Sequence, residues 1–245
     1  MSVQKTALRG NGFTFKQFFV AHDNCAMKVG TDGVLLGAWA PVTQADTILD
    51  IGSGTGLLAL MLAQRTPETS LIDAVELDTA ATQQAQENVQ ASPWASRITV
   101  HQADIRHWAP QVNRRYSLIV SNPPFFEKGS ACSSAERAQA RYTTTLSYPA
   151  LLSCARQWIT DQGLFCLILP TMVADEFITQ ANQLGWQLRL RTDVAGKEHR
   201  PSQRVLLGLS LQPGDLIHTE LAIRGEDNLY SPAHCQLTRD FYLYR

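Results

Sequence analysis

The sequence predicts an α/β fold built on a mostly parallel sheet with helices on both faces. From residue 47 onward, short β-rich apolar runs alternate with stretches of helical pattern, which is typical of β–α–β units. The last two apolar runs are joined by residues 193–203, which leave no room for a helical crossover. We therefore expect an antiparallel hairpin at one edge of the sheet.

Seven strands and four helices are expected in order along the chain. The strands are placed at 47–51, 71–76, 98–101, 117–121, 164–169, 188–192 and 205–211. The helices are placed at 57–65, 79–90, 149–160 and 174–184. Residues 1–46 lack this alternation, so we expect them to form an N-terminal appendage that covers a ligand site, before one domain at 47–245.

Composition and charge exclude several classes of protein. Hydrophobic residues make up 44% of the 245 residues, which argues against disorder. The 21 Lys and Arg balance 22 Asp and Glu, which excludes a uniformly basic nucleic-acid binder but allows local basic patches. Five scattered cysteines without a C-x-x-C predict neither a disulfide framework nor a metal site. The N-terminus has no signal-peptide pattern, and no apolar run approaches the roughly 20 residues of a membrane span, so we expect a cytoplasmic protein without a membrane partner.

A glycine-rich turn follows the first expected strand. Gly52, Gly54 and Gly56 alternate as G-x-G-x-G between that strand and the next helix. Glycine lets the backbone approach a ligand closely or adopt a positive φ, and open α/β sheets bind ligands at the carboxyl ends of their strands. The spacing differs from the G-x-G-x-x-G of dinucleotide loops, and the G-K-[S/T] ending of a P-loop is missing.

Acidic residues stand at the ends of the next two strands. Glu76 is placed to accept hydrogen bonds from both ribose hydroxyls of a nucleoside, and Asp104 from an adenine amine. A tight turn and ordinary helix caps would explain each feature alone. Together the loop and the two acids resemble the S-adenosylmethionine site of Rossmann-like methyltransferases, and Asp50 matches the acid that this family carries before its glycine loop.

The fourth expected strand runs into a proline turn, Asn122-Pro123-Pro124-Phe125. Two prolines remove two backbone donors and fix φ, so the turn is stiff and leaves carbonyls free. The side-chain oxygen of Asn122 and the carbonyl of Pro123 are placed to accept both hydrogens of a planar amine, while Phe125 offers a face for a flat base. Such contacts concentrate electron density on a nitrogen that is otherwise a poor nucleophile.

This turn matches the [D/N/S]-P-P-[F/Y/W] motif of amino-methyltransferases that act on adenine, guanine, cytosine or a glutamine amide. Further stretches at 11–18, 27–39 and 141–145 make the chain resemble the bacterial tRNA(Val) adenine-N6-methyltransferases, which modify the adenine just 3′ of the anticodon, at position 37. The likeness covers nearly the whole chain.

The resemblance implies a Rossmann-like class I fold, S-adenosylmethionine as methyl donor with S-adenosylhomocysteine as product, and the anticodon loop of a valine tRNA as partner. We expect no metal and no obligate protein partner. The implied catalytic residues are Asn122, Pro123, Pro124 and Phe125. The implied cofactor-binding residues are Lys28, Thr31, Asp32, Asp50, Gly52, Gly54, Gly56, Glu76, Asp104 and Asn122.

One departure leaves alternatives open. The family usually carries N-P-P-Y, whereas this chain has Phe125, and N-P-P-F is also common in guanine-N2 methyltransferases of ribosomal RNA. A glutamine-N5 protein methyltransferase is a second alternative. The stretches at 28–39 and 141–145 favour the tRNA enzyme. A catalytically silent RNA chaperone would be expected to lose the proline turn, and the glycine spacing disfavours a nicotinamide-dependent oxidoreductase.

Basic residues concentrate around the last two strands, in a stretch that also holds His199 and Arg204. The candidates for RNA contact are Arg141, Arg189, Arg191, Lys197 and Arg200. Such a cluster would contact phosphates and make binding fall steeply with salt. A solvated loop that carries charge for solubility is the alternative.

Overall fold

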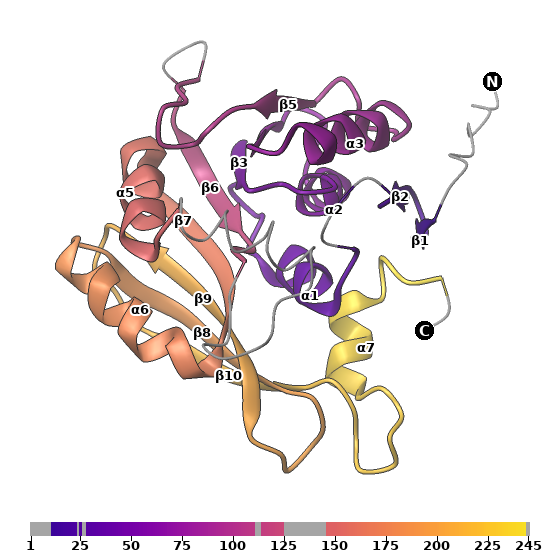
Figure 1. The fold of residues 1–245 in the computed structure, drawn as a ribbon. Coiled ribbons are helices and arrows are strands. Elements are labelled where there is room, and N and C mark those ends of the chain that lie inside the picture. Colours follow the sequence, from indigo (N-terminus) through magenta and orange to yellow (C-terminus); the bar gives the residue numbers. More distant parts are fainter. Residues whose placement is uncertain (1–10, 24, 26–27, 111–113, 125–145, 244–245) are drawn as a thin grey trace, which may run out of the picture.

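One eight-stranded sheet forms the centre of the protein (Figure 1). The computed structural model describes residues 11–23, 25, 28–110, 114–124 and 146–243. Across the sheet the order is β10-β8-β9-β7-β6-β3-β4-β5, and among these strands only β9 runs against its neighbours. The strands are β3 (Thr47–Ile51), β4 (Leu71–Glu76), β5 (Ile98–Gln102), β6 (Tyr116–Ser121), β7 (Ile159–Pro170), β8 (Gln187–Ala195), β9 (Ser202–Ser210) and β10 (Ile217–Ala222).

The predicted fold class is confirmed, with one strand more than the seven expected. The antiparallel β8–β9 pair is present, but β10 pairs parallel with β8 and forms the edge of the sheet in its place. The sequence of β10 alternates weakly because four of its six residues are exposed and only Leu221 is buried. A polar edge strand of this kind carries little of the apolar pattern from which strands are predicted.

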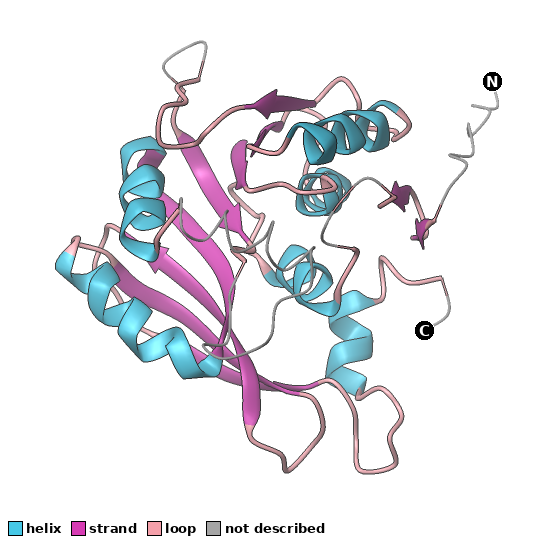
Figure 2. Ribbon diagram, in the orientation of Figure 1, coloured by secondary structure: helices cyan, strands magenta, loops and turns pink. Residues whose placement is uncertain are grey.

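Helices cover both faces of the sheet, because the strands carry apolar side chains on both faces (Figure 2). Alternate residues of β3 point to opposite sides, so Ile48 joins one core and Leu49 the other. The Ile48 side carries α1 (Thr31–Trp39), α2 (Leu57–Arg65), α3 (Thr79–Gln90) and α7 (Pro232–Thr238), and the Leu49 side carries α5 (Tyr148–Trp158) and α6 (Thr171–Gln183). In the described part of the chain, no helix is both long enough and apolar enough to cross a membrane.

The N-terminal segment packs into the core on the Ile48 side. A hairpin of β1 (Gly12–Thr14) and β2 (Phe19–Ala21) precedes α1, and its loop buries Phe15 and Phe18. The side chain of Asn88 on α3 accepts a hydrogen bond from the backbone N–H of Ala21 and donates one to its carbonyl, both at 2.9 Å. These hydrogen bonds attach the hairpin to α3, while α1 packs against α2, the helix that follows the glycine-rich turn.

Candidate functional site

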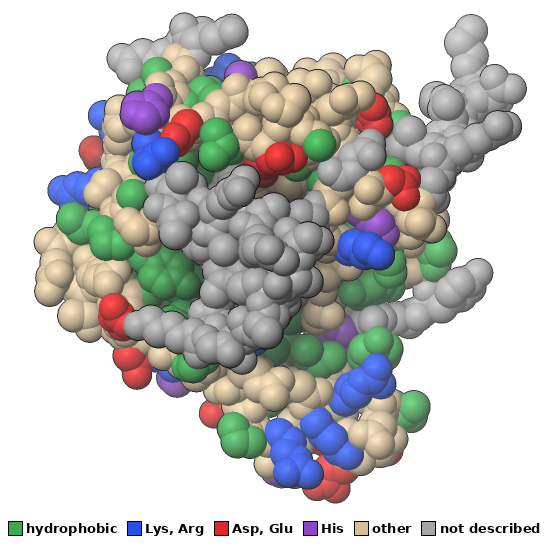
Figure 3. Space-filling view, in the orientation of Figure 1, with side chains coloured by type: hydrophobic (Ala, Val, Ile, Leu, Met, Phe, Trp, Pro, Cys, Tyr) green, Lys and Arg blue, Asp and Glu red, His purple; other side chains and the backbone are tan. Residues whose placement is uncertain are grey.

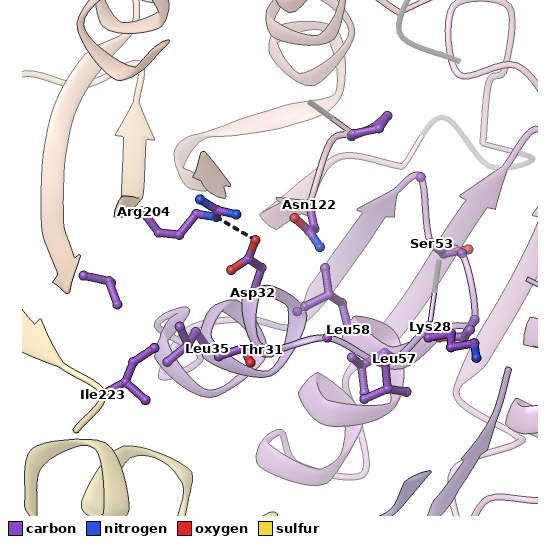
Figure 4. Close-up of a pocket in the computed structure, with 18 of the residues that line it drawn as sticks. Lys28, Thr31, Asp32, Leu35, Ser53, Leu57, Leu58, Asn122, Arg204 and Ile223 are labelled. Atoms are coloured by element: carbon purple, nitrogen blue, oxygen red, sulfur yellow. Dashed lines mark hydrogen bonds and ion pairs between the residues drawn. The ribbon is translucent and has the colours of Figure 1, made fainter. Parts of the chain in front are cut away.

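A cavity of about 580 Å³ lies at the carboxyl ends of the central strands (Figure 4). Its walls come from the start of α1, the glycine loop after β3, the turn after β6, and the ends of β8, β9 and β10. Because β9 runs antiparallel, its first residues reach this same edge of the sheet. The cavity therefore lies where open α/β sheets bind their ligands.

The glycine loop has the left-handed backbone that its sequence predicted. Gly52, Gly54 and Gly56 have φ values of 74°, 53° and 79°, and Gly56 caps the start of α2. A Cβ built on Gly54 meets no atom within 4 Å, whereas one on Gly56 meets Ala85 at 3.4 Å. The loop thus presents bare backbone to open space at Gly54 and packs tightly on α3 at Gly56.

Glu76 holds the loop in this shape. One oxygen of its carboxylate accepts a hydrogen bond from the backbone N–H of Gly54 at 2.8 Å, and the other accepts one from Asp78 at 2.9 Å. The side chain is 5% exposed, and burial raises the pKa of Glu76. Glu76 is tied to the cavity wall through Gly54, although it does not itself line the described cavity.

The two other predicted acids lie outside the cavity walls. Asp50 is fully buried at the end of β3, and burial together with the nearby charge of Glu76 raises its pKa to about 7. Asp104 follows β5 and accepts hydrogen bonds from the backbone and the guanidinium of Arg106, at 2.9 and 3.0 Å. Those bonds hold the pKa of Asp104 below its ordinary value.

The proline turn lies beside the glycine loop. The hydroxyl of Ser121 donates to the carbonyl of Ile51 at 2.8 Å and so ties the end of β6 to the end of β3. Asn122 and Pro124 line the cavity, with the Asn122 side chain directed into it (Figure 4). Within the described structure, the side-chain oxygen of Asn122 is shielded from solvent and has no hydrogen-bond partner. A buried acceptor without a donor is costly unless a ligand satisfies it. Phe125 lies outside the described residues.

The predicted residues of the N-terminal segment, Lys28, Thr31 and Asp32, all line the cavity. Asp32 is also paired with Arg204 on β9, with 2.9 Å between the guanidinium Nε and the carboxylate. From the sequence, Arg204 was expected only as part of a basic stretch along one flank of the site, and not as a residue that lines the cavity. The predicted antiparallel direction of this strand was the signal that could have placed it there.

The candidate RNA-binding residues do not form one cluster. Arg189 donates to backbone carbonyls of the loop before β10, and Arg191 pairs with Asp193 and Asp175. Lys197 and Arg200 lie together in the turn between β8 and β9, where Figure 3 shows Lys and Arg side chains gathered at the lower end of the molecule. Arg141 lies outside the described residues.

The basic turn is contacted by the turn that follows β10, which carries an acidic residue. Lys197 donates to the side chain of Asn228 at 2.9 Å, and His199 lies 3.3 Å from Glu226. This second turn, after β10, thus packs on the first. In the part of the chain that the structure describes, no three His, Cys, Asp or Glu side chains are grouped so as to hold a metal ion.

Comparison with known proteins decides the family. The model of the methyltransferase small domain matches residues 27–141. The chain is 62% identical over 245 residues to the tRNA1(Val) (adenine(37)-N6)-methyltransferase of Erwinia tasmaniensis, with 100% of both chains covered. It is 60% identical over 244 residues to the enzyme of the same name from Cronobacter sakazakii, again with 100% of both covered. The chain belongs to the tRNA1(Val) (adenine(37)-N6)-methyltransferase family.

Solved structures of more distant methyltransferases share the fold of this family member. A predicted O-methyltransferase from Agrobacterium tumefaciens superposes with a TM-score of 0.66 at 17% identity, covering 86% of this chain and 96% of that one. The glycopeptide N-methyltransferase MtfA, complexed with S-adenosylmethionine, superposes with a TM-score of 0.53 at 15% identity, covering 74% and 95%. The predicted class I methyltransferase fold and the predicted family are both confirmed.

Proposed function

We propose that the protein transfers a methyl group from S-adenosylmethionine to N6 of adenine 37 in the anticodon loop of tRNA1(Val). The observation that carries the proposal concerns Asn122, which lines the cavity beside the glycine loop: its side-chain oxygen is shielded from solvent and has no hydrogen-bond partner in the described structure. The names of relatives at 62% and 60% identity supply the substrate.

The residues at the loop end of the cavity fit the methyl donor. Gly54 offers open space against bare backbone, so the ligand can lie on the loop without meeting a side chain. Lys28 and Thr31 line the same end and offer a cation and a hydroxyl to an amino-acid tail. When bound, S-adenosylmethionine supplies an electrophilic methyl group on a positively charged sulfur. Glu76 and Asp104 are proposed for the ribose and adenine, with Asp50 as support beneath the loop.

Asn122 and the prolines prepare the target amine. The lone pair of an adenine N6 is delocalised into the ring, which makes the nitrogen a poor nucleophile. The side-chain oxygen of Asn122 and the carbonyl of Pro123 accept its two N–H groups, which localises the lone pair and aims it. Pro124 has no N–H that could compete for these acceptors. Preorganised acceptors of this kind act by positioning and electrostatics, without a strong base.

The remaining parts of the proposal concern the surroundings of the site. The start of α1 lines the cavity, which supports a cover formed by residues 1–46. Lys197 and Arg200 are proposed to contact the tRNA backbone next to the cavity wall formed by Gly196. We propose that the reaction takes place in the cytoplasm and requires neither a metal ion nor a second protein.

The proposal is tested with purified protein, methyl-labelled S-adenosylmethionine and total RNA from cells that lack this gene. The RNA is separated by size and digested, and the labelled nucleoside is identified by mass. N6-methyladenosine confined to the tRNA fraction is the expected result. N2-methylguanosine in ribosomal RNA would support the alternative that Phe125 raised. No label in any RNA would contradict the proposal and move the search to protein substrates, which is the second alternative.

A further inference from the structure

The cavity has two arms that meet at Asn122. Figure 4 shows Ser53 and Lys28 on one side of Asn122, and Arg204 and Ile223 on the other. A Cβ built on Gly33 of α1 would lie 4.0 Å from the Asn122 amide nitrogen, so α1 forms the floor where the arms meet. The loop arm fits the methyl donor, which leaves the second arm for another ligand.

The second arm combines apolar walls with Gln203 and the ion pair of Arg204 and Asp32. Leu35, Val194 and Ile223 contribute apolar surface, and Arg204 is the one Lys or Arg among the described residues that line this arm. Apolar walls suit a flat base and the carbon face of a ribose, whereas a guanidinium suits an anion. The second arm therefore offers apolar surface for a base and a cation for a phosphate, as a nucleotide requires.

Arg204 is held in a fixed orientation. Its Nε donates to the carboxylate of Asp32 at 2.9 Å, and one terminal nitrogen donates to the carbonyl of Gln203 at 3.0 Å. Its side chain is 32% exposed and that of Asp32 is 24% exposed, so solvent screens this pair only in part. Contacts from a strand and from a helix fix the plane of the five-donor guanidinium at the cavity wall.

We propose that Arg204, oriented by Asp32, binds a backbone phosphate next to the target adenosine. This inference rests on the proposed function, because a base that reaches Asn122 must bring its own sugar–phosphate chain into the cavity mouth. Guanidinium groups bind phosphates through paired hydrogen bonds that position the nucleic acid without reading its sequence. Asp32 is then a positioning residue for the substrate and not a contact of the cofactor.

The test compares Arg204→Gln with Arg115→Gln. Arg115 stands just before β6, at the amino end of the sheet, and donates to the carbonyls of Gln157 and Ile159. The two variants lose the same charge, so only position distinguishes them. Affinity for unmodified tRNA1(Val) is measured over a salt series, and affinity for S-adenosylhomocysteine is measured by calorimetry. Thermal unfolding of each variant confirms that it is folded.

We expect Arg204→Gln to weaken tRNA binding roughly tenfold and to reduce the slope of log K against log salt by about one. S-adenosylhomocysteine affinity stays within twofold, and Arg115→Gln changes neither quantity. Arg204→Lys keeps the charge, so the slope of log K against log salt should be unchanged while part of the tRNA affinity is lost. If Arg204→Gln does not fold, Arg204→Lys serves as the test variant. Asp32→Asn raises the KM for tRNA while kcat stays within twofold.

Two results would overturn the inference. An unchanged tRNA affinity and salt slope in Arg204→Gln would show that no phosphate binds there. A selective loss of S-adenosylhomocysteine affinity in Arg204→Gln or Asp32→Asn would place the pair in the cofactor site. These results can be distinguished from failure of the proposed function. If that function were wrong, the unmutated protein itself would form no N6-methyladenosine in tRNA.

Discussion

The backbone N–H of Gly54 donates a hydrogen bond of 2.8 Å to the carboxylate of Glu76, 22 residues further along the chain. The bond joins the loop after β3 to the end of β4, and it fixes a loop whose glycines all have positive φ. Glu76 therefore shapes the loop on which the cofactor is proposed to lie, in addition to its proposed contact with a ribose.

Replacing Glu76 with Ala should weaken S-adenosylhomocysteine binding at least roughly tenfold, because the loop loses a charge-assisted hydrogen bond and its fixed shape. Calorimetry measures the change. The control is Glu87→Ala on α3, whose carboxylate accepts only from Gln83 and Gln84 among the described contacts. Equal affinities in the two variants would show that Glu76 does not support the site.

Gly54→Ala should reduce cofactor affinity more than its backbone strain alone explains. The added methyl would occupy open space beside the loop, where the ligand is proposed to lie, and φ of 53° costs about 1 kcal/mol for alanine. Gly185, with φ of 80°, lies before β8 at the opposite edge of the sheet. Gly185→Ala should lose at least as much stability, because its Cβ would also meet the Arg156 guanidinium at 2.5 Å, yet it should bind S-adenosylhomocysteine normally. The prediction fails if both variants bind equally well.

Asp50 should make the protein less stable as the pH rises. Its pKa is about 7 when folded, against 3.8 ordinarily, because the carboxyl is buried near Glu76. Between pH 3.8 and pH 7 the folded state keeps a proton that the unfolded state releases, so the free energy of unfolding falls as the pH rises. The full loss of stability is reached above pH 7. Asp50→Asn removes this dependence. Urea unfolding should show the stability of the variant rising relative to the parent by about 2 kcal/mol from pH 5 to pH 8. A constant difference would contradict the prediction.

Asp73 should show the opposite dependence. Burial alone would raise its pKa, but hydrogen bonds from His101 and Tyr116 and the charge of Arg114 outweigh burial and lower it. The carboxylate therefore contributes stability above its ordinary pKa, and the contribution is lost as the pH falls through the lowered value. Asp73→Asn should destabilise the fold by about 2–3 kcal/mol at pH 7, since it leaves Arg114 without its charge partner. Chemical denaturation at pH 7 and at a pH well below the ordinary value of 3.8 should show this loss shrinking with acid.

The first half of the sheet could be predicted almost to the residue, because its apolar runs end at clear signals. The glycines end β3 at Ile51, and Asp78 caps α3 by accepting from the N–H of Ala81. The predicted bounds of β3, β4, α2 and α3 are confirmed.

Helix α1 shows what the sequence could not reveal. Its residues from Gly33 to Ala38 are all buried, so the helix has no polar face and no 3.6-residue period from which to be predicted. Helix α7 is short, but Ser231 and Pro232 form a capping signal that could have been used.

The residues of the candidate site likewise fall into those that the sequence predicts and those that it does not. Residues of the glycine loop and the proline turn were predicted because each motif is continuous in sequence and follows a strand. The pairing of Asp32 with Arg204 joins residues 172 apart and depends on the direction of β9. The spread of Arg189, Arg191 and Lys197 follows from the length of β8, which runs beyond the predicted strand to Ala195 and separates basic residues that are close in sequence.

The most direct test of the account uses Asn122→Ala with unmodified tRNA1(Val) and a transcript carrying guanosine at position 37. The methylated nucleotide is mapped by nuclease digestion and mass spectrometry, and S-adenosylhomocysteine binding is measured in parallel. We expect the parent protein to place one methyl group on adenine 37 and none on the guanosine transcript. Asn122→Ala should still bind S-adenosylhomocysteine and should lose roughly a hundredfold or more in kcat. Methylation at another position, or full activity of Asn122→Ala, would contradict the account.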